Sequence, residues 1–250
     1  MPIDLIRDSF PADAALDTAV SRALLLRVAA GELPETLRVA RPGPMVAFGK
    51  RDVVSAGYAN AVAAARGAGF EPIERLAGGR AAAFHEGTVS FTHAIPDADP
   101  RSGVDGRFEA TAALVAAAFA RLGVKARIGE IPGEYCPGAH SVNAAGERKL
   151  MGVGQRLISG GALVGGLIVV DGADRLNEVL TPVYAALGLD WRPEVTGSVA
   201  GEAPATTWDQ VVEALIAEYE ERHGLEPATL DEETLLLAKR LAPEHESPEV

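Results

Sequence analysis

Short apolar runs bounded by turn residues alternate with amphipathic helical segments along the chain, and this alternation constrains the fold most. Strands are predicted at residues 36–40, 45–48, 71–75, 81–84, 88–94, 125–128, 141–144, 149–158 and 162–170. Helices are predicted at residues 12–31, 58–66, 105–122, 175–187, 208–223 and 231–241. The Arg-Pro-Gly-Pro link predicts that strands 36–40 and 45–48 pair. We therefore expect an α+β fold with a mixed, mostly antiparallel sheet flanked by helices.

The stretch 190–205 is rich in glycine and proline, has little hydrophobic periodicity, and is the best linker candidate. A length of 250 residues suits one full domain, with or without a small appendage. We therefore expect a main domain over residues 1–205 and a C-terminal helical appendage with a tail over residues 206–250.

The charge and cysteine counts exclude several classes of function. A net charge of −12 argues against a broad nucleic-acid surface, because binding phosphates needs a basic field. No run approaches the length of a membrane helix, and the first ten residues resemble neither a signal nor a transit peptide. A single cysteine rules out an internal disulfide and a cysteine-based zinc cluster. We expect a cytoplasmic protein without membrane contact.

The first segment that can carry chemistry spans residues 75–87. Gly78 and Gly79 let the backbone approach a ligand closely, and the arginines at positions 75 and 80 can hold a carboxylate or phosphate. A plain Gly-Gly turn with solvated arginines fits the same residues. His85 follows without the spacing of a metal-binding motif, so we expect no metal here.

The second segment, residues 132–140, places Cys136 between two Pro-Gly turns. His140 and downstream cations can lower the pKa of such a loop thiol and make it a nucleophile, with His140 as a candidate base. An incidental loop thiol is the alternative.

The third segment, residues 146–156, begins a strand at Lys149, and this strand is flanked by small residues. A partly desolvated ammonium can polarise an acyl carbonyl or hold a phosphate, and Gly152 and Gly154 let a flexible ligand pass close to the strand. An edge lysine that prevents strand pairing is the alternative.

In this order the three segments resemble the lipoate–protein ligase and octanoyltransferase superfamily, which shares its class II synthetase-like catalytic fold with biotin protein ligases. The resemblance covers about residues 10–190. The Glu-Tyr-Cys-Pro-Gly loop and Glu86-Gly87 look closest to the branch that moves an octanoyl group from the glycine-cleavage H protein to other lipoyl domains. The chain departs from the simple ligases at Arg80, where they have a third glycine, and at His85, which lies one residue later.

The resemblance implies that Cys136 forms an acyl thioester, which a lysine of the acceptor lipoyl domain then attacks. Lys149 would stabilise the oxyanion, and neither ATP nor a metal would be needed. The octanoyl or lipoyl chain would lie in an apolar tunnel. The implied substrate-binding residues are Arg75, Gly78, Gly79, Arg80, His85, Gly152, Gly154 and Gln155. The implied partners are the glycine-cleavage H protein and the E2 subunits of 2-oxoacid dehydrogenases.

Two other functions fit the same resemblance. An ATP-dependent lipoate–protein ligase would use ATP and Mg²⁺, with Lys149 holding the acyl-adenylate, but residues 206–250 look small for the accessory domain of such ligases. An inactive relative would bind lipoyl domains or lipoate only. A biotin ligase lacks support, because the biotin motif is missing.

The lipoyl domains of this superfamily are often acidic, as this chain is. Docking of such a domain would therefore need a local basic rim around the site. We expect that rim to be formed by Arg75, Arg80, Arg148 and Arg156.

Overall fold

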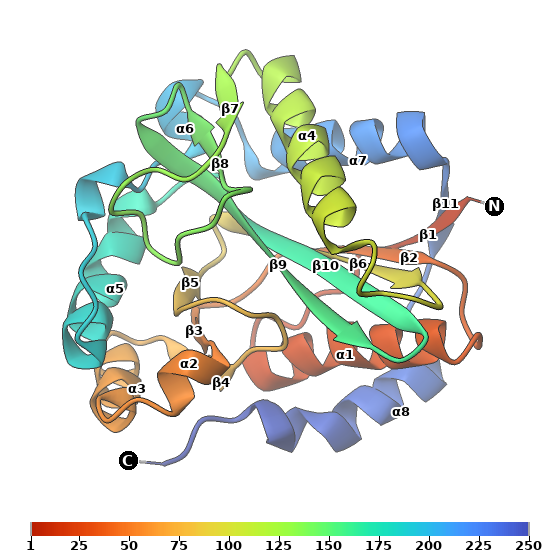
Figure 1. Ribbon diagram of the computed structural model, residues 1–250, viewed down its shortest axis with the longest axis horizontal. Helices are drawn as coiled ribbons and strands as arrows, with labels where there is room; N and C mark the ends of the chain where they lie inside the picture. Colours follow the sequence, from red (N-terminus) through yellow and green to blue (C-terminus); the bar gives the residue numbers. More distant parts are fainter. Residues whose placement is uncertain (1, 250) are drawn as a thin grey trace.

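The computed structural model describes residues 2–249, and an eight-stranded sheet runs through them (Figure 1). Its strands, in spatial order, are β11 (Leu225–Ala228), β1 (Ile3–Ile6), β2 (Thr36–Ala40), β6 (Thr88–Pro96), β10 (Gly161–Val169), β9 (Arg148–Ile158), β8 (Val142–Ala144) and β7 (Ala126–Ile128). β1 is parallel to both of its neighbours, and the other pairs are antiparallel. The expected mixed, mostly antiparallel sheet is confirmed.

A second, three-stranded sheet has the order β4 (Glu71–Glu74), β3 (Met45–Phe48), β5 (Ala82–Phe84). The predicted pairing of strands 36–40 and 45–48 is therefore wrong, because β2 pairs with β6 while β3 pairs with β4 and β5. The link between them crosses from one sheet to the other. Its Gly43 packs so closely that a Cβ there would lie 1.8 Å from the Pro11 carbonyl oxygen. Prolines on both sides remove amide donors that a hairpin would use.

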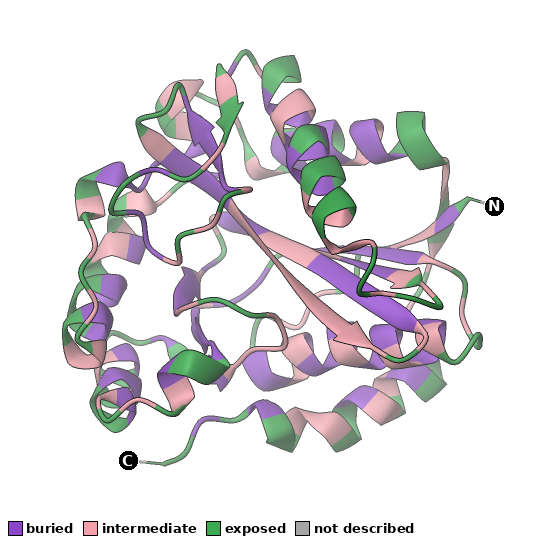
Figure 2. Ribbon diagram, in the orientation of Figure 1, coloured by how far each residue is buried: buried purple, intermediate pink, exposed green. Residues whose placement is uncertain are grey.

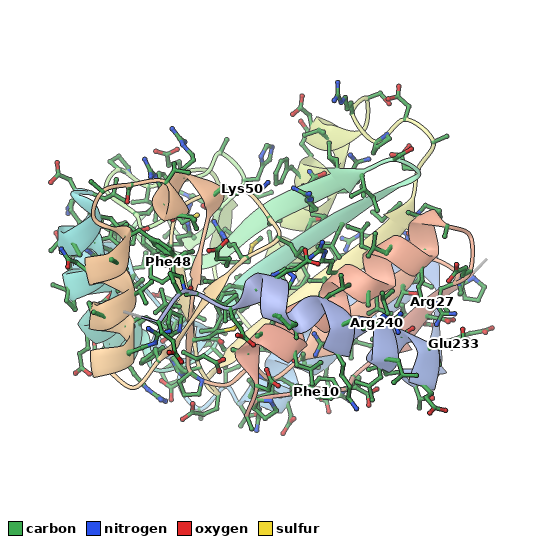
Figure 3. The ribbon with its side chains drawn as sticks, turned by 90° about the horizontal axis from the view of Figure 1, so that it is seen from below. Phe10, Arg27, Phe48, Lys50, Glu233 and Arg240 are labelled. Carbon is green, nitrogen blue, oxygen red and sulfur yellow. The ribbon has the colours of Figure 1, made fainter. Side chains whose placement is uncertain are left out.

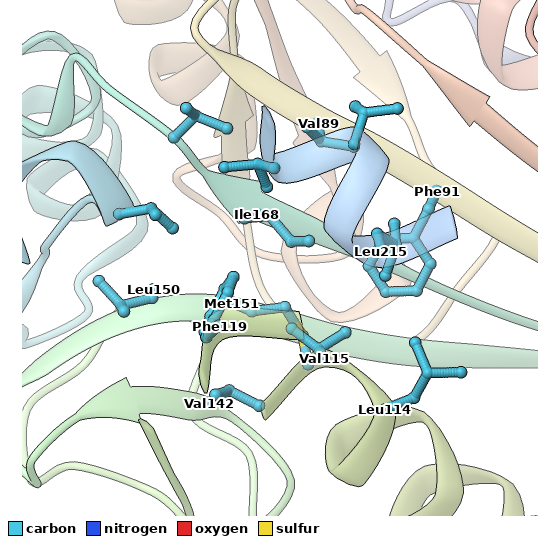
Figure 4. Close-up of a cluster of buried hydrophobic side chains, with 14 of the residues drawn as sticks. Val89, Phe91, Leu114, Val115, Phe119, Val142, Leu150, Met151, Ile168 and Leu215 are labelled. Carbon is cyan, nitrogen blue, oxygen red and sulfur yellow. The ribbon is translucent and has the colours of Figure 1, made fainter. Parts of the chain in front are cut away.

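Helices cover both faces of the large sheet. α4 (Val104–Arg121) and α7 (Trp208–His223) pack on the Phe91 side, whereas α1 (Ala14–Ala29) packs on the Ala94 side with α8 (Glu232–Leu241) outside it. Odd and even residues of a strand point to opposite faces, so Phe91 and Ala94 place these helices on opposite sides. Figure 4 shows Phe91 packed among side chains of α4, α7 and the sheet.

The small sheet is covered by α3 (Tyr58–Gly67) and α5 (Ala173–Leu187), which pack together at one end of the molecule (Figure 1). α2 (Lys50–Val53) directly follows β3. Figure 2 shows that burial is concentrated in the sheets and in the helix faces that contact them. Residues of both sheets line one cavity between them.

Residues after position 205 pack into the same hydrophobic core as the residues before it. Val211, Leu215 and Tyr219 of α7 belong to the same buried cluster as Phe91, and β11 extends the large sheet beside β1. The stretch 190–205 holds η1 (Pro193–Val195) and α6 (Val199–Glu202), and Val199 is fully buried. The division at residue 205 stays a prediction. Within residues 2–249, no helix has the length and apolar character needed to cross a membrane.

Candidate active site

A cavity of about 530 Å³ lies where the two sheets meet. Residues 75–79, which follow β4, line one wall, and residues 135–141 line another. The strands β9 and β10 contribute Gly152, Gly154, Gly165 and Gly166. The lining is mostly apolar, with polar groups concentrated around the thiol of Cys136 and beside α1. Such a cavity suits a flexible apolar chain with one reactive end.

Cys136 stands at this cavity in a left-handed backbone conformation, with φ of 42°. Its amide N–H donates to the Tyr184 hydroxyl at 2.7 Å, and that hydroxyl donates to the Ala81 carbonyl at 2.9 Å. The Sγ atom accepts from Arg75 Nη2 and from the Arg80 amide N–H, both at 3.3 Å. The thiol is therefore fixed in position by α5 and by the Gly-Gly segment.

The charges around Cys136 favour its thiolate. Burial alone would raise the pKa of this thiol, but the positive charges of Arg75 and Lys149 and the hydrogen bonds from Arg75 and Arg80 lower the pKa below its usual value. A lowered pKa increases the fraction of thiolate, which is the nucleophilic form. The lowered pKa is compatible with a reactive Cys136, and that reactivity stays a prediction.

Lys149 is almost fully buried and donates three hydrogen bonds from its Nζ atom. The acceptors are Glu134 Oε1 at 3.0 Å and the carbonyl oxygens of Tyr135 and Cys136, both at 2.9 Å. An ammonium has three protons, and all three are used. Lys149 thus fixes the cysteine loop through these three hydrogen bonds. Its ammonium can bind an acyl oxygen only if it releases one of the three acceptors.

Glu134 is the buried counter-ion of Lys149 and organises the rest of the loop. Its carboxylate accepts from the amides of Ile131 and Gly138 and from the Ser141 hydroxyl. Glu134, Tyr135 and Tyr184 were not among the residues predicted for the site. The first two lie directly before Cys136, which was a usable signal, whereas nothing in the sequence connects Tyr184 with position 136.

The four predicted glycines are near the thiol, and their role in binding a substrate stays a prediction. Gly78, Gly79, Gly152 and Gly154 all line the cavity. At Gly79, with φ of 104°, a Cβ would lie 2.7 Å from Cys136 Sγ and closer still to the Arg75 guanidinium. Only glycine permits this approach of the loop to the thiol.

Arg80 and His85 contribute differently from what the sequence suggests. The Arg80 side chain donates to the buried Asp52 at 3.0 Å, so this residue offers its amide to the thiol. His85 does not line the cavity. It accepts from the Gly87 amide at 2.9 Å and lies 3.2 Å from the Gly172 carbonyl oxygen, and burial followed by the charge of Arg175 lowers its pKa. It stabilises the turn between β5 and β6.

Gln155 and His140 both line the cavity without contacting the thiol. The side chain of Gln155 joins Arg107 at 2.9 Å and the Val104 carbonyl at 2.8 Å, which fixes the start of α4. His140 stacks on Phe108 with ring centroids 5.1 Å apart. No hydrogen bond between the described atoms joins His140 to Cys136, and the candidate base role of His140 stays a prediction.

The expected basic rim is present only in part. Arg75 and Arg156 line a second cavity of about 180 Å³ beside the first, together with Lys50. Arg80 is paired with Asp52, and Arg148 is paired with Glu202 at 2.6 Å near the opposite end of β9. Across residues 2–249, no group of three His, Cys, Asp or Glu side chains is arranged to hold a metal ion.

Curated relatives of the chain are acyltransferases by name. An octanoyl-[GcvH]:protein N-octanoyltransferase from Geobacillus kaustophilus is 27% identical over 229 residues, which is 92% of this chain and 77% of the relative. A protein of the same name from Exiguobacterium sibiricum is 30% identical over 61% of this chain and 52% of its own length. A lipoyl-[GcvH]:protein N-lipoyltransferase from Listeria monocytogenes is 24% identical over 75% of this chain and 71% of the relative.

Solved structures share the fold. A lipoate-protein ligase A bound with ATP superposes with a TM-score of 0.79 at 22% identity, covering 98% of this chain and 95% of the other. A bipartite lipoate protein ligase from Thermoplasma acidophilum gives a TM-score of 0.75 at 20% identity, covering 98% and 93%. The model of the lipoyl protein ligase A/B catalytic domain matches residues 13–220. The chain belongs to the lipoyl protein ligase A/B catalytic domain family.

Proposed function

We propose that this protein transfers an octanoyl or lipoyl group from one lipoyl-domain protein to a lysine of another through a thioester on Cys136. The names of its relatives support an acyltransferase that acts on octanoyl and lipoyl groups. One observation carries the thioester step. The Cys136 thiol lies at an apolar cavity, within 3.3 Å of a guanidinium and a backbone amide that stabilise its thiolate.

The first half-reaction moves the acyl group onto the enzyme. The Cys136 thiolate attacks the donor amide carbon and forms a C–S bond, and the carbonyl oxygen takes the negative charge. Collapse of this adduct breaks the C–N bond, and the donor lysine leaves as an amine after its nitrogen takes a proton from solvent. The Arg80 amide and the Arg75 guanidinium contact the sulfur before attack, which places them beside the developing charge.

The second half-reaction is the reverse with a different amine. A neutral lysine of the acceptor attacks the thioester carbon, the new C–N bond forms, and the C–S bond breaks. The amine loses its proton, and sulfur leaves as the thiolate that Arg75 and Lys149 stabilise. Dividing one amide exchange into two acyl transfers is the general advantage of covalent catalysis. We also propose that no step requires ATP or a metal.

The acyl chain occupies the cavity between the sheets. Gly152 and Gly154 leave space along β9, and Gly78 and Gly79 form the opposite side next to the sulfur. GcvH, the carrier in the relatives' names, is the proposed donor. The E2 subunits of 2-oxoacid dehydrogenases are proposed as acceptors.

The test is transfer from an octanoylated GcvH to an apo lipoyl domain without ATP, followed by intact mass. We expect acylated enzyme to accumulate when the acceptor is omitted. Cys136→Ser should abolish both the acylated enzyme and transfer, whereas Ser102→Ala, on an exposed turn, should leave both intact. Normal transfer by Cys136→Ser would exclude the thioester. A strict ATP requirement would indicate a ligase, and no transfer at all would indicate an inactive relative.

A further inference from the structure

The chain beyond α8 returns to the small sheet through η2 (Ala242–His245) (Figure 3). Glu244 forms an ion pair with Arg22 at 2.8 Å, and Glu246 bridges to Ile73 of β4. Figure 1 shows that the C-terminus ends near α3. We call residues 242–249 the C-terminal tail.

The end of the tail is anchored on α3. The hydroxyls of Tyr58 and Ser247 lie 2.9 Å apart, and Arg66 donates to the carbonyl oxygens of Ser247 and Pro248 at 3.3 and 3.0 Å. The tail therefore covers the edge of β4 that β3 leaves free.

His245 connects the tail to the last residue of β4. Its side chain is 4% exposed, and its Nδ1–H donates to the Glu74 carbonyl oxygen at 2.7 Å. Arg75 directly follows Glu74, and its amide donates to the Phe48 carbonyl oxygen of β3 at 3.0 Å. The backbone that carries Arg75 is thus held by β3 on one side and by the tail on the other.

The Arg75 guanidinium depends on this backbone for its position. Among the described residues it has no carboxylate partner, and its buried Nε–H has no acceptor. Its Nη2 atom donates to Cys136 Sγ at 3.3 Å. A guanidinium that no carboxylate holds is positioned by its main chain and its packing, so displacement of β4 would move it away from the sulfur.

We propose that the C-terminal tail, through His245, is a positioning element for Arg75 and thereby for the reactive thiolate of Cys136. The inference rests on the proposed function, in which Cys136 is the nucleophile. His245 touches neither the sulfur nor the acyl cavity, and it acts through the Glu74 carbonyl and the adjacent guanidinium.

The test compares two substitutions of His245 that differ in the hydrogen bond. His245→Asn keeps an N–H donor near the Nδ1 position, whereas His245→Leu fills similar space without a donor. The measurement is the rate of Cys136 alkylation as a function of pH, which is unambiguous because the chain has one cysteine. Arg75→Met serves as the reference for complete loss of the cation, and Lys239→Ala, exposed on α8, is the control.

We expect His245→Leu to raise the thiol's pKa by about one pH unit and to slow alkylation up to about tenfold below that pKa. His245→Asn and Lys239→Ala should stay close to the parent. The proposal fails if His245→Leu keeps the parent's pH midpoint, or if His245→Asn shifts that midpoint equally.

If His245→Leu does not fold, Ser247→Ala replaces it, because this change removes the hydroxyl that joins the tail to Tyr58 and leaves the contact of Tyr58 with Glu74 in place. A smaller rise of the midpoint is expected, and no rise would overturn the proposal. Alkylation reports on the thiol without any acyl transfer. If Cys136→Ser disproves the thioester route, the alkylation measurement still tests whether the tail positions Arg75.

Discussion

At the scale of single residues, the least expected finding is the complete engagement of Lys149. Its ammonium is buried against Glu134 and two main-chain carbonyls of the cysteine loop. Buried charges are costly unless they are paired and hydrogen-bonded, and here both requirements are met. The lysine shapes the loop and lowers the pKa of the thiol at the same time.

Glu134→Gln tests this arrangement. The amide keeps an acceptor for Lys149 but removes the counter-charge, so the buried ammonium loses its compensation. We expect the free energy of unfolding to fall by about 3–5 kcal/mol. Urea denaturation measures it.

The matched control is Glu221→Gln, which removes a carboxylate paired with Arg121 on the surface. This change should cost less than about 1 kcal/mol. Equal losses for the two variants would contradict a dominant role of the buried pair.

The sequence singles out Cys136 and Lys149 because each lies in a segment of unusual composition, and the structure joins them, since Lys149 on β9 donates to the Cys136 carbonyl oxygen. It misleads at His85, which lies within the Gly-Gly segment but turns toward Gly172. Membership in a segment does not determine where a side chain points. Glu134 escaped notice because an acidic loop residue is normally solvated.

At the scale of elements, glycines recur where β9 and β10 pair. Gly154 is opposite Gly165, whereas Gly152 is opposite Leu167. A Cβ on Gly154 would lie 3.0 Å from Ala77 Cβ, so the space beside this strand is set by missing side chains. Glycine weakens a strand, so these residues cost stability. What they contribute in return is the volume of the cavity beside β9.

Gly154→Val should close part of this space. Overpacking costs about 1–3 kcal/mol, so formation of the octanoyl-enzyme should slow about tenfold or more. An acetyl donor, whose chain does not reach the strand, should be affected far less. The ratio of the two acylation rates, followed by intact mass, is the measurement.

Gly106→Val is the control, because the position is exposed on α4 and nothing lies near its Cβ site. This variant should leave the ratio unchanged. If Gly154→Val has the same ratio of octanoyl to acetyl acylation rates as Gly106→Val, the acyl chain does not lie along β9.

Element prediction succeeded where periodicity was strong and failed where it was absent. The helices around residues 105–122 and 208–223 match α4 and α7 closely. β11 was missed because Glu226 and Pro227 interrupt any apolar alternation, and main-chain pairing with β1 builds that strand. The pairing of β2 with β3 was predicted wrongly because a short link does not reveal that it joins two sheets.

At the scale of the whole molecule, charge is unevenly distributed. The chain carries −12 overall, yet the small cavity beside the thiol gathers four cations, Arg22, Lys50, Arg75 and Arg156, against the carboxylates of Glu74 and Glu244. Lys50 and Arg156 form no ion pair within the described residues. This is where an acidic lipoyl domain would be attracted.

Reversing both charges, with Lys50→Glu and Arg156→Glu, should lower kcat/KM for a protein acceptor about tenfold at low salt. Transfer to a small amine should not change, because it needs no docking. The difference should shrink as the ionic strength rises.

Lys239→Glu on α8 provides the same change of charge away from the site and should have little effect. If the double variant and this control reduce transfer alike, overall charge and not the local cluster governs the encounter.

The cavity between the sheets also bears on the protein without its substrate. Glycines on the strands leave this space open, and its walls are mostly apolar. If the proposed thioester forms, an octanoyl chain on Cys136 covers part of these apolar walls, so the acylated protein is the better packed of the two states.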